Sequence, residues 1–182
     1  IKKISEIKIQ YNPIWDDVRL LSAKVVQPDG TENMISPKEI NIMDQGWVSA
    51  APRYPGGKIL VASLPGVSVG SVIEYELSMD FKDRPFIAFD SYVRDNSPIR
   101  RKSFSLAYPE DMPLKVEDLI TPAMPGVLEA GKGTLEFEVK DSPAIKSEPS
   151  LPPRWFFVPG ILVSTGDWKS YCGVLRAGLE KK

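Results

Sequence analysis

The segment Ser71–Phe81 reads SVIEYELSMDF, an alternation of apolar and polar side chains over its whole length. The apolar side chains occupy every second position: Ile73, Tyr75, Leu77, Met79 and Phe81. Successive side chains of a β-strand point to opposite faces of the sheet, so this period of two predicts a half-buried strand. We expect Tyr75 and Leu77 to point toward a core and Glu76 to point toward solvent.

The same alternation recurs on both sides of this strand. Leu135, Phe137 and Val139 alternate with charged residues in the segment 134–140, and shorter alternations occupy residues 7–11 and 103–108. Breakers such as Pro65-Gly66, and most of the 17 prolines, fall between these runs. About eight to ten short strands without alternating helices predict an all-β fold, an antiparallel β-sandwich with one C-terminal helix.

The C-terminal helix is predicted near residues 165–181. One apolar stripe runs along it at helical spacing: Trp168, Tyr171, Leu175 and Leu179. Ser164 and Asp167 have the spacing of a capping box, which makes Ser164 the expected N-cap. We interpret the stripe as an interdomain face, which packs partly on an apolar strand predicted at residues 155–163 and partly on another domain.

The predicted domain boundary lies at the start of this helix. Residues 1–163 are assigned to the β-sandwich domain, and residues 164–182 to the helix, which is expected to lead to a missing downstream domain. Prolines 143, 149, 152, 153 and 159 favour an extended connector at about residues 142–159, because proline does not continue helices or central strands.

The composition excludes several classes of protein. Histidine is absent, which removes every catalytic mechanism built on a Ser-His or Cys-His pair. The 23 basic and 24 acidic residues give a net charge of −1, so no nucleic-acid partner is predicted. No apolar run approaches the roughly 18 residues of a membrane span. Neither a cofactor nor a metal site is predicted.

Two potential nucleophiles are interpreted as structural. The run Gly66-Val67-Ser68-Val69-Gly70 matches the G-x-S-x-G pattern of hydrolases, but a strand follows it and no histidine base exists, so we expect a loop. Cys172 lies on the apolar side of the helix and is expected to be buried. A Ser–Lys dyad stays open on composition, although no S-x-x-K signature supports it.

One cluster of aromatic and cationic side chains is the best candidate for a ligand surface: Trp47, Arg53 and Tyr54. The aspartates between residues 80 and 95, Asp90 among them, are interpreted as solvated acids, because no calcium-loop pattern accompanies them. The basic run at residues 100–102 is interpreted as a solvated strand edge.

Several stretches, taken in order, resemble one protein family. They are Trp15-Asp16-Asp17, Gln27-Pro28-Asp29-Gly30, Tyr54-Pro55-Gly56, the run SLPGVSVGSVIEY at 63–75, Pro143-Ala144-Ile145 with Glu148 and Pro152-Pro153, and Val163-Ser164 followed by Trp168. The family is the domain of unknown function that precedes the transglutaminase-like core in secreted bacterial proteins. The resemblance implies a β-sandwich, a periplasmic or extracellular location and a catalytic Cys-His-Asp core further along.

Two functions follow as alternatives. The first is a non-catalytic accessory domain that packs on or orients a covalently linked, cysteine protease-like transglutaminase core. The second is a β-sandwich that binds a glycan or a peptide and brings the core to its substrate, which rests on fold analogy and on the four tryptophans. In both cases the chain itself is expected to have no enzymatic activity.

Overall fold

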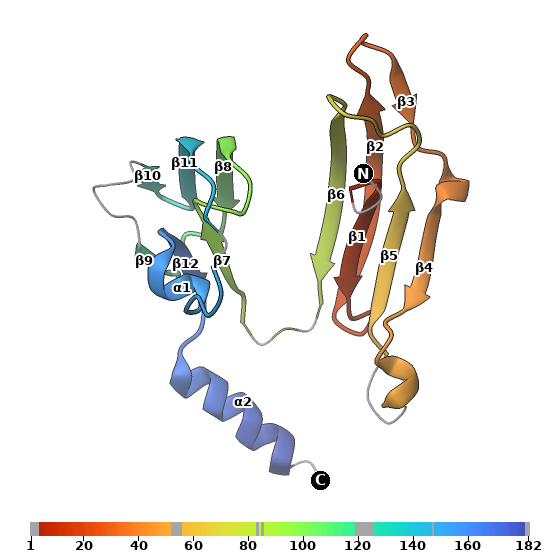
Figure 1. Ribbon diagram of the computed structural model, residues 1–182. Helices are drawn as coiled ribbons and strands as arrows, with labels where there is room; N and C mark the ends of the chain where they lie inside the picture. Colours follow the sequence, from red (N-terminus) through yellow and green to blue (C-terminus); the bar gives the residue numbers. More distant parts are fainter. Residues whose placement is uncertain are drawn as a thin grey trace. The chain divides into compact units, whose positions relative to one another are not determined.

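The computed structural model describes residues 4–51, 56–82, 84, 86–118, 126–146 and 148–180, with side chains except at 118 and 126–130. The chain divides into two compact units, residues 1–84 and 85–182. Figure 1 colours the strands of the first unit from red to yellow-green and those of the second from green to blue. The described residues of each unit form two three-stranded sheets, and the strand pairs in them are antiparallel.

The first unit pairs its strands in the orders β1-β5-β4 and β3-β2-β6. The strands are β1 (Glu6–Tyr11), β2 (Asp16–Val26), β3 (Glu32–Met34), β4 (Ile40–Asp44), β5 (Lys58–Ser63) and β6 (Val72–Phe81), and the 3₁₀ turns are η1 (Pro37–Glu39) and η2 (Val48–Ala50). Buried side chains from both sheets form one core: Ile7, Val18, Ala23, Val25, Leu60, Ala62 and Leu64. The two sheets therefore bury their apolar faces against each other.

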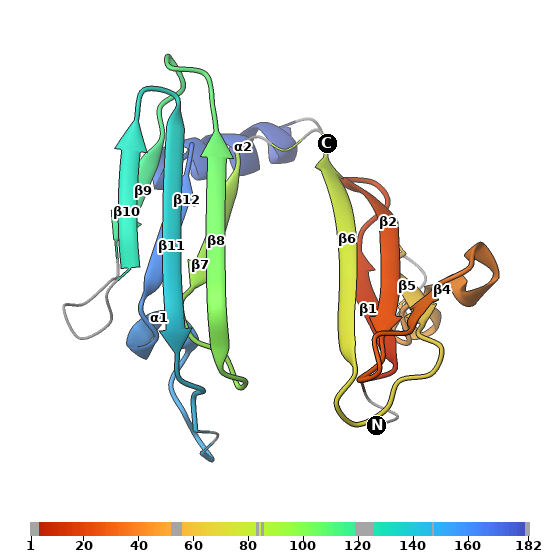
Figure 2. The ribbon, with the colours of Figure 1, turned by 90° about the horizontal axis from the view of Figure 1, so that it is seen from above.

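The second unit repeats this two-layer arrangement in the orders β10-β11-β8 and β7-β12-β9. Its elements are β7 (Ala88–Tyr92), β8 (Ile99–Ala107), β9 (Lys115–Asp118), β10 (Gly126–Gly131), β11 (Thr134–Ser142), α1 (Arg154–Phe157), β12 (Gly160–Ser164) and α2 (Trp168–Glu180). In Figure 2, β11 lies between β10 and β8, and the other sheet lies behind them. The core is Val93, Leu135, Phe137, Val139, Ile161 and Val163.

The alternation at residues 134–140 is confirmed in β11, where Leu135, Phe137 and Val139 are buried. The expectation for residues 71–81 holds only in part. Leu77 packs against the first core, but Tyr75 keeps 54% of its surface exposed. β6 lies at the edge of its sheet, and its pairing with β2 is irregular between Leu20 and Ser22, so the large tyrosine ring extends beyond the cover of the opposite sheet.

The predicted fold class is confirmed, since the described residues form antiparallel sheets followed by one long C-terminal helix. The division of the strands differs from the expected single domain over residues 1–163. They form two layered units that meet in sequence between Arg84 and residue 85. Periodicity identifies the buried face of each strand, but it carries no information on which strands share a core.

The region before the helix also differs from its prediction. Residues 155–163 do not form one strand: α1 occupies Arg154–Phe157, and β12 begins at Gly160. α2 lies where the helix was predicted, but its cap is Asp167 instead of Ser164, which ends β12. Within the described residues, neither α1 nor α2 is long and apolar enough to cross a membrane.

Candidate functional site

A groove of about 710 Å³ lies in the second unit between the outer face of the sheet β7-β12-β9 and the first turn of α2. Its floor follows from the register of the three strands. Leu162 in the middle strand is paired with Asp90 on one side and with Glu117 on the other. Directly opposed residues share a face of the sheet, so the two acids flank the leucine on the outer face.

The next row of the floor is Ser164, paired with Ala88 and Lys115. In the intervening row, Val163 is buried in the core and Phe89 packs against the same cluster, whereas Val116 on the edge strand β9 is 38% exposed. Side chains alternate between the two faces of the sheet along each strand. One face therefore carries the groove floor, which mixes polar and apolar side chains, and the other face carries the apolar interior.

The groove's helical wall depends on how α2 begins. The Asp167 carboxylate accepts hydrogen bonds from the Ser170 backbone N–H at 2.9 Å and from the Ser170 hydroxyl at 2.7 Å, which makes Asp167 the N-cap. The Lys115 ammonium donates to the other carboxylate oxygen at 3.0 Å. The hydrogen bonds from Ser170, followed by that from Lys115, hold the pKa of Asp167 well below its usual range. The ion pair also ties the helix to β9.

A glycine brings this turn close to the sheet. A Cβ atom on Gly166 would lie 2.7 Å from Cγ of Phe86, nearer than two carbon atoms approach without displacement. The Ser164 hydroxyl stabilises the same turn, since it donates to the Gly166 carbonyl at 3.0 Å and accepts from the Gly166 N–H at 3.1 Å. Glycine is therefore required at this position for α2 to start over Phe86.

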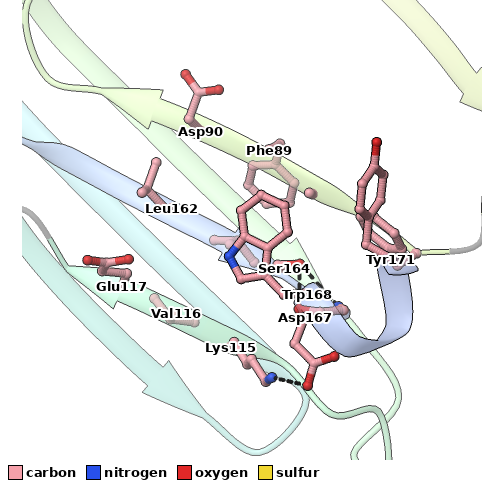
Figure 3. Close-up of a pocket in the computed structure, with 14 residues that line it drawn as sticks. Phe89, Asp90, Lys115, Val116, Glu117, Leu162, Ser164, Asp167, Trp168 and Tyr171 are labelled. Atoms are coloured by element: carbon pink, nitrogen blue, oxygen red, sulfur yellow. Dashed lines mark hydrogen bonds and ion pairs between the residues drawn. The ribbon is translucent and has the colours of Figure 1, made fainter. Parts of the chain in front are cut away.

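Two aromatic rings form the helical wall. The rings of Trp168 and Tyr171 meet edge to face with centroids 6.0 Å apart, and Tyr171 makes a similar contact with Phe86 at 6.2 Å. Figure 3 shows Trp168 and Tyr171 on the helix side of the groove, with Asp90 and Glu117 toward the other end. Trp168 keeps 82% of its surface exposed, so a large aromatic face is open to a ligand.

The groove carries net negative charge. Lys115 is bound to Asp167, so this cation is already neutralised. Asp90 and Glu117 are exposed and make no hydrogen bond or ion pair with a described residue. Asp90 has a longer-range electrostatic interaction with Lys102. Two carboxylates without an ion pair to a described residue, on either side of an apolar side chain, give the groove the character of a cation-binding surface.

The predicted ligand cluster is described only at Trp47. This half-exposed side chain precedes η2, and its indole N–H donates to the Gln45 side-chain oxygen at 2.7 Å. Arg53 and Tyr54 lie outside the described residues, so the proposed cluster stays a prediction.

The predicted helix stripe is present on α2, and its four side chains are exposed to different degrees. Tyr171, which is 41% exposed, contacts Phe86, and Leu175 and Leu179 are exposed. The expected burial of Cys172 is wrong: its thiol is exposed, because α2 has no buried residue. The role of the stripe as an interdomain face stays a prediction.

The G-x-S-x-G run forms a loop before β6, as expected. Gly66 and Gly70 have φ values of 70° and 89°, a region that glycine adopts without strain. The Ser68 hydroxyl donates to the Gln27 side-chain oxygen at 2.9 Å and lies 2.9 Å from the Ser71 hydroxyl. These neutral partners contain no base for a nucleophile. Among the described residues, no group of three or more His, Cys, Asp or Glu is placed to hold a metal ion.

The groove residues Asp90, Glu117 and Leu162 were not recognised as a site in the sequence. They come from β7, β9 and β12, which are far apart in the chain and become neighbours only through strand register. An outward-facing leucine opposite two acids is the signal that could identify the site, but it requires the pairing to be known. The sequence pattern assigns Asp90 to the solvated acids and carries no local signal at Glu117 or Leu162.

Comparison with known proteins relates the chain to one family and one solved structure. A comparison with curated proteins finds no significant match. The fold is similar to that of a "putative protease" from Parabacteroides distasonis, with a TM-score of 0.76 and 23% sequence identity. The similarity covers 89% of this chain and 33% of that protein, so the chain spans about a third of its length. The model of DUF3857, a domain of unknown function with a solved structure, matches residues 1–146, and the chain belongs to this family.

Proposed function

We propose that the chain is a non-catalytic interaction domain that packs on, or orients, a catalytic core in the same polypeptide. The observation that carries this proposal is the concentration of exposed apolar side chains late in the second unit. Among the described residues from 148 to 180, nine large hydrophobic side chains are exposed: Leu151, Trp155, Phe156, Phe157, Trp168, Tyr171, Val174, Leu175 and Leu179. Soluble proteins rarely gather so many exposed apolar side chains unless a partner covers them.

The aromatic residues of α1 are held in place rather than loosely attached. The Arg154 guanidinium donates to the Arg94 carbonyl oxygen at 2.6 Å and lies over the Tyr92 ring at 5.5 Å. Trp155 and Phe156 remain 60% and 71% exposed beside this anchor. Rigid aromatic side chains that project from a fixed backbone are typical centres of protein interfaces, because little conformational entropy is lost when they are buried.

The wider context supports an attached core without defining it. The similar protein from Parabacteroides distasonis is about three times as long as the matched region. The family resemblance suggests a transglutaminase-like core in an exported protein. This chain has no histidine, so a Cys-His mechanism would have to use residues from another part of the polypeptide.

A second candidate function is ligand binding, and the groove favours it. Its volume of about 710 Å³ falls within the usual range of ligand pockets, and its lining combines aromatic and aliphatic side chains with a few polar groups. A peptide or a glycan held there could be presented to the core. The two functions share Trp168 and Tyr171, which line the groove, whereas Leu175 and Leu179 lie outside it and belong to the first function alone.

Hydrogen exchange tests the first proposal. The 182-residue chain and a longer natural polypeptide that contains it are compared by following the backbone amides of α1 and α2. We expect exchange in both helices to slow in the longer polypeptide, because a partner covers their apolar side chains. Exchange in β11, a central strand of the second unit, provides the internal reference and should not change.

A matched pair of variants links the protection to the apolar stripe. Leu175→Asp should remove the slowing in α2, whereas Ala177→Asp, on the opposite side of the helix, should retain it. Equal exchange in the short and long polypeptides would contradict packing on a core. A dimer of the short chain that Leu175→Asp abolishes would instead identify a second copy as the partner.

A further inference from the structure

We infer that the groove binds a peptide through a lysine or arginine side chain, whose cation lies over Leu162 between Asp90 and Glu117 and whose aliphatic stem lies against Trp168. This inference deepens the second candidate function and rests on it. It extends that function from an unspecified ligand to a basic peptide.

Strand register sets the dimensions of the cation site. Asp90 and Glu117 are each paired with Leu162, one on each side. Adjacent strands are about 4.8 Å apart, so the two acidic residues lie roughly 10 Å apart across the leucine. This separation is between backbone positions, and both side chains project from the same outer face, so a cation over Leu162 has one acid on each side of it. An apolar surface beside two acids matches a long side chain that has an aliphatic stem and a charged end.

The helical wall adds a second recognition element. Trp168 is 82% exposed and lines the groove together with Leu162. An indole face attracts a cation and also covers methylene groups, so it suits both parts of a lysine or arginine side chain. Tyr171 supports the tryptophan by an edge-to-face contact, and Phe86 in turn makes an edge-to-face contact with Tyr171.

Charge distinguishes a basic peptide from other occupants. The described lining of the groove contains three carboxylates, at Asp90, Glu117 and Asp167, and one cation, Lys115, which is paired with Asp167. An anionic ligand would meet two unpaired carboxylates and be repelled. A neutral glycan could stack on Trp168, but it would leave the negative charge uncompensated. Only a cationic ligand uses the apolar floor, the aromatic wall and both free acids.

Binding to the 182-residue chain can be followed by NMR and calorimetry. The probe is a capped alanine heptapeptide with two lysines, and the comparison peptide has norleucine at the same positions. We expect the lysine peptide to shift the signals of Leu162, Glu117 and the Trp168 indole, and to bind more weakly as salt is raised. The norleucine peptide should bind at least about fivefold more weakly, the effect of one or two exposed charge pairs.

Isosteric variants test the role of each acid. Asp90→Asn and Glu117→Gln should each weaken lysine-peptide binding by roughly two- to fivefold, and the double variant by about tenfold. Glu136→Gln removes an exposed acid from β11 in the other sheet and should leave binding unchanged. Full affinity in the double variant would overturn the inference.

The comparison peptide separates the inference from the function on which it rests. Equal binding of the norleucine and lysine peptides at Leu162 and Trp168 would overturn the cationic specificity but retain the groove as a peptide site. Shifts caused by a neutral oligosaccharide and not by the lysine peptide would replace the peptide with a glycan. No shift with any of the probes would overturn both the inference and the ligand-binding function.

Discussion

Replacing Phe137 with alanine tests the packing of the second unit most directly. Phe137 lies on β11, the middle strand of its sheet, and only 2% of its surface is exposed. A buried phenylalanine removes about 150 Å² of apolar surface from water, which at about 25 cal/mol per Å² corresponds to about 4 kcal/mol. Its neighbours in the core are held by strand pairing on both sides, so the resulting cavity should not close easily. We therefore expect Phe137→Ala to lower the free energy of unfolding by about 3–5 kcal/mol.

Urea denaturation followed by circular dichroism measures this loss. Small domains have a free energy of unfolding of about 5–15 kcal/mol, so Phe137→Ala could leave the unit largely unfolded. Phe137→Leu keeps most of the volume and provides a measurable variant, with an expected loss of less than about 2 kcal/mol. Glu136→Ala, one position away on the outer face, is the control and should change stability by no more than about 0.5 kcal/mol. Equal losses for Phe137→Ala and Glu136→Ala would refute the assignment of the two faces.

Three further predictions follow from single positions. Leu77→Ala should cost about 2–3 kcal/mol by urea denaturation, whereas Tyr75→Ala, at an exposed ring, should cost less; the opposite order would contradict the packing of β6. Gly160→Ala should disrupt β12, because a Cβ would lie 2.7 Å from a backbone oxygen of β7, whereas Gly173→Ala should make α2 more helical by circular dichroism. Folding lowers the pKa of Asp167, so the stabilisation of α2 by this cap should be complete above 3.8, the ordinary pKa of an aspartate, and should be lost as the pH falls through the lower pKa of the folded state. NMR can follow the titration of the Asp167 carboxyl group, and a midpoint near 3.8 would contradict this prediction.

The strands were predictable from the sequence because their signal is local. The face of β11 follows from alternation alone, since charged residues alternate with Leu135, Phe137 and Val139 and need no information from other strands. The exposure of Tyr75 could not be read in the same way. It depends on the edge position of β6 and on the irregular pairing with β2, and both are properties of the assembled sheet.

The start of α2 shows a different limit. Ser164 and Asp167 both have the chemistry of an N-cap, and their spacing favoured Ser164. The pairing of Ser164 with Ala88 and Lys115 keeps it in β12, which leaves Asp167 as the cap. The inclusion of Ser164 in β12 therefore determines which of the two candidate N-caps begins the helix. The exposure of Cys172 has the same origin, since an apolar stripe predicts a covered face but not the element that covers it.

The central position of β12 has a consequence for how this domain should be delimited. β12 joins β7 to β9 and contributes Ile161 and Val163 to the core, yet it begins at Gly160, beyond the residues matched by the family. A polypeptide ending at residue 146 would lose the middle strand of this sheet. β7 and β9 would then expose unpaired edges and part of the apolar interior, a condition that promotes aggregation. The unit that folds is therefore longer than the unit that sequence similarity defines, and truncation for expression or domain transplantation should fall after Ser164.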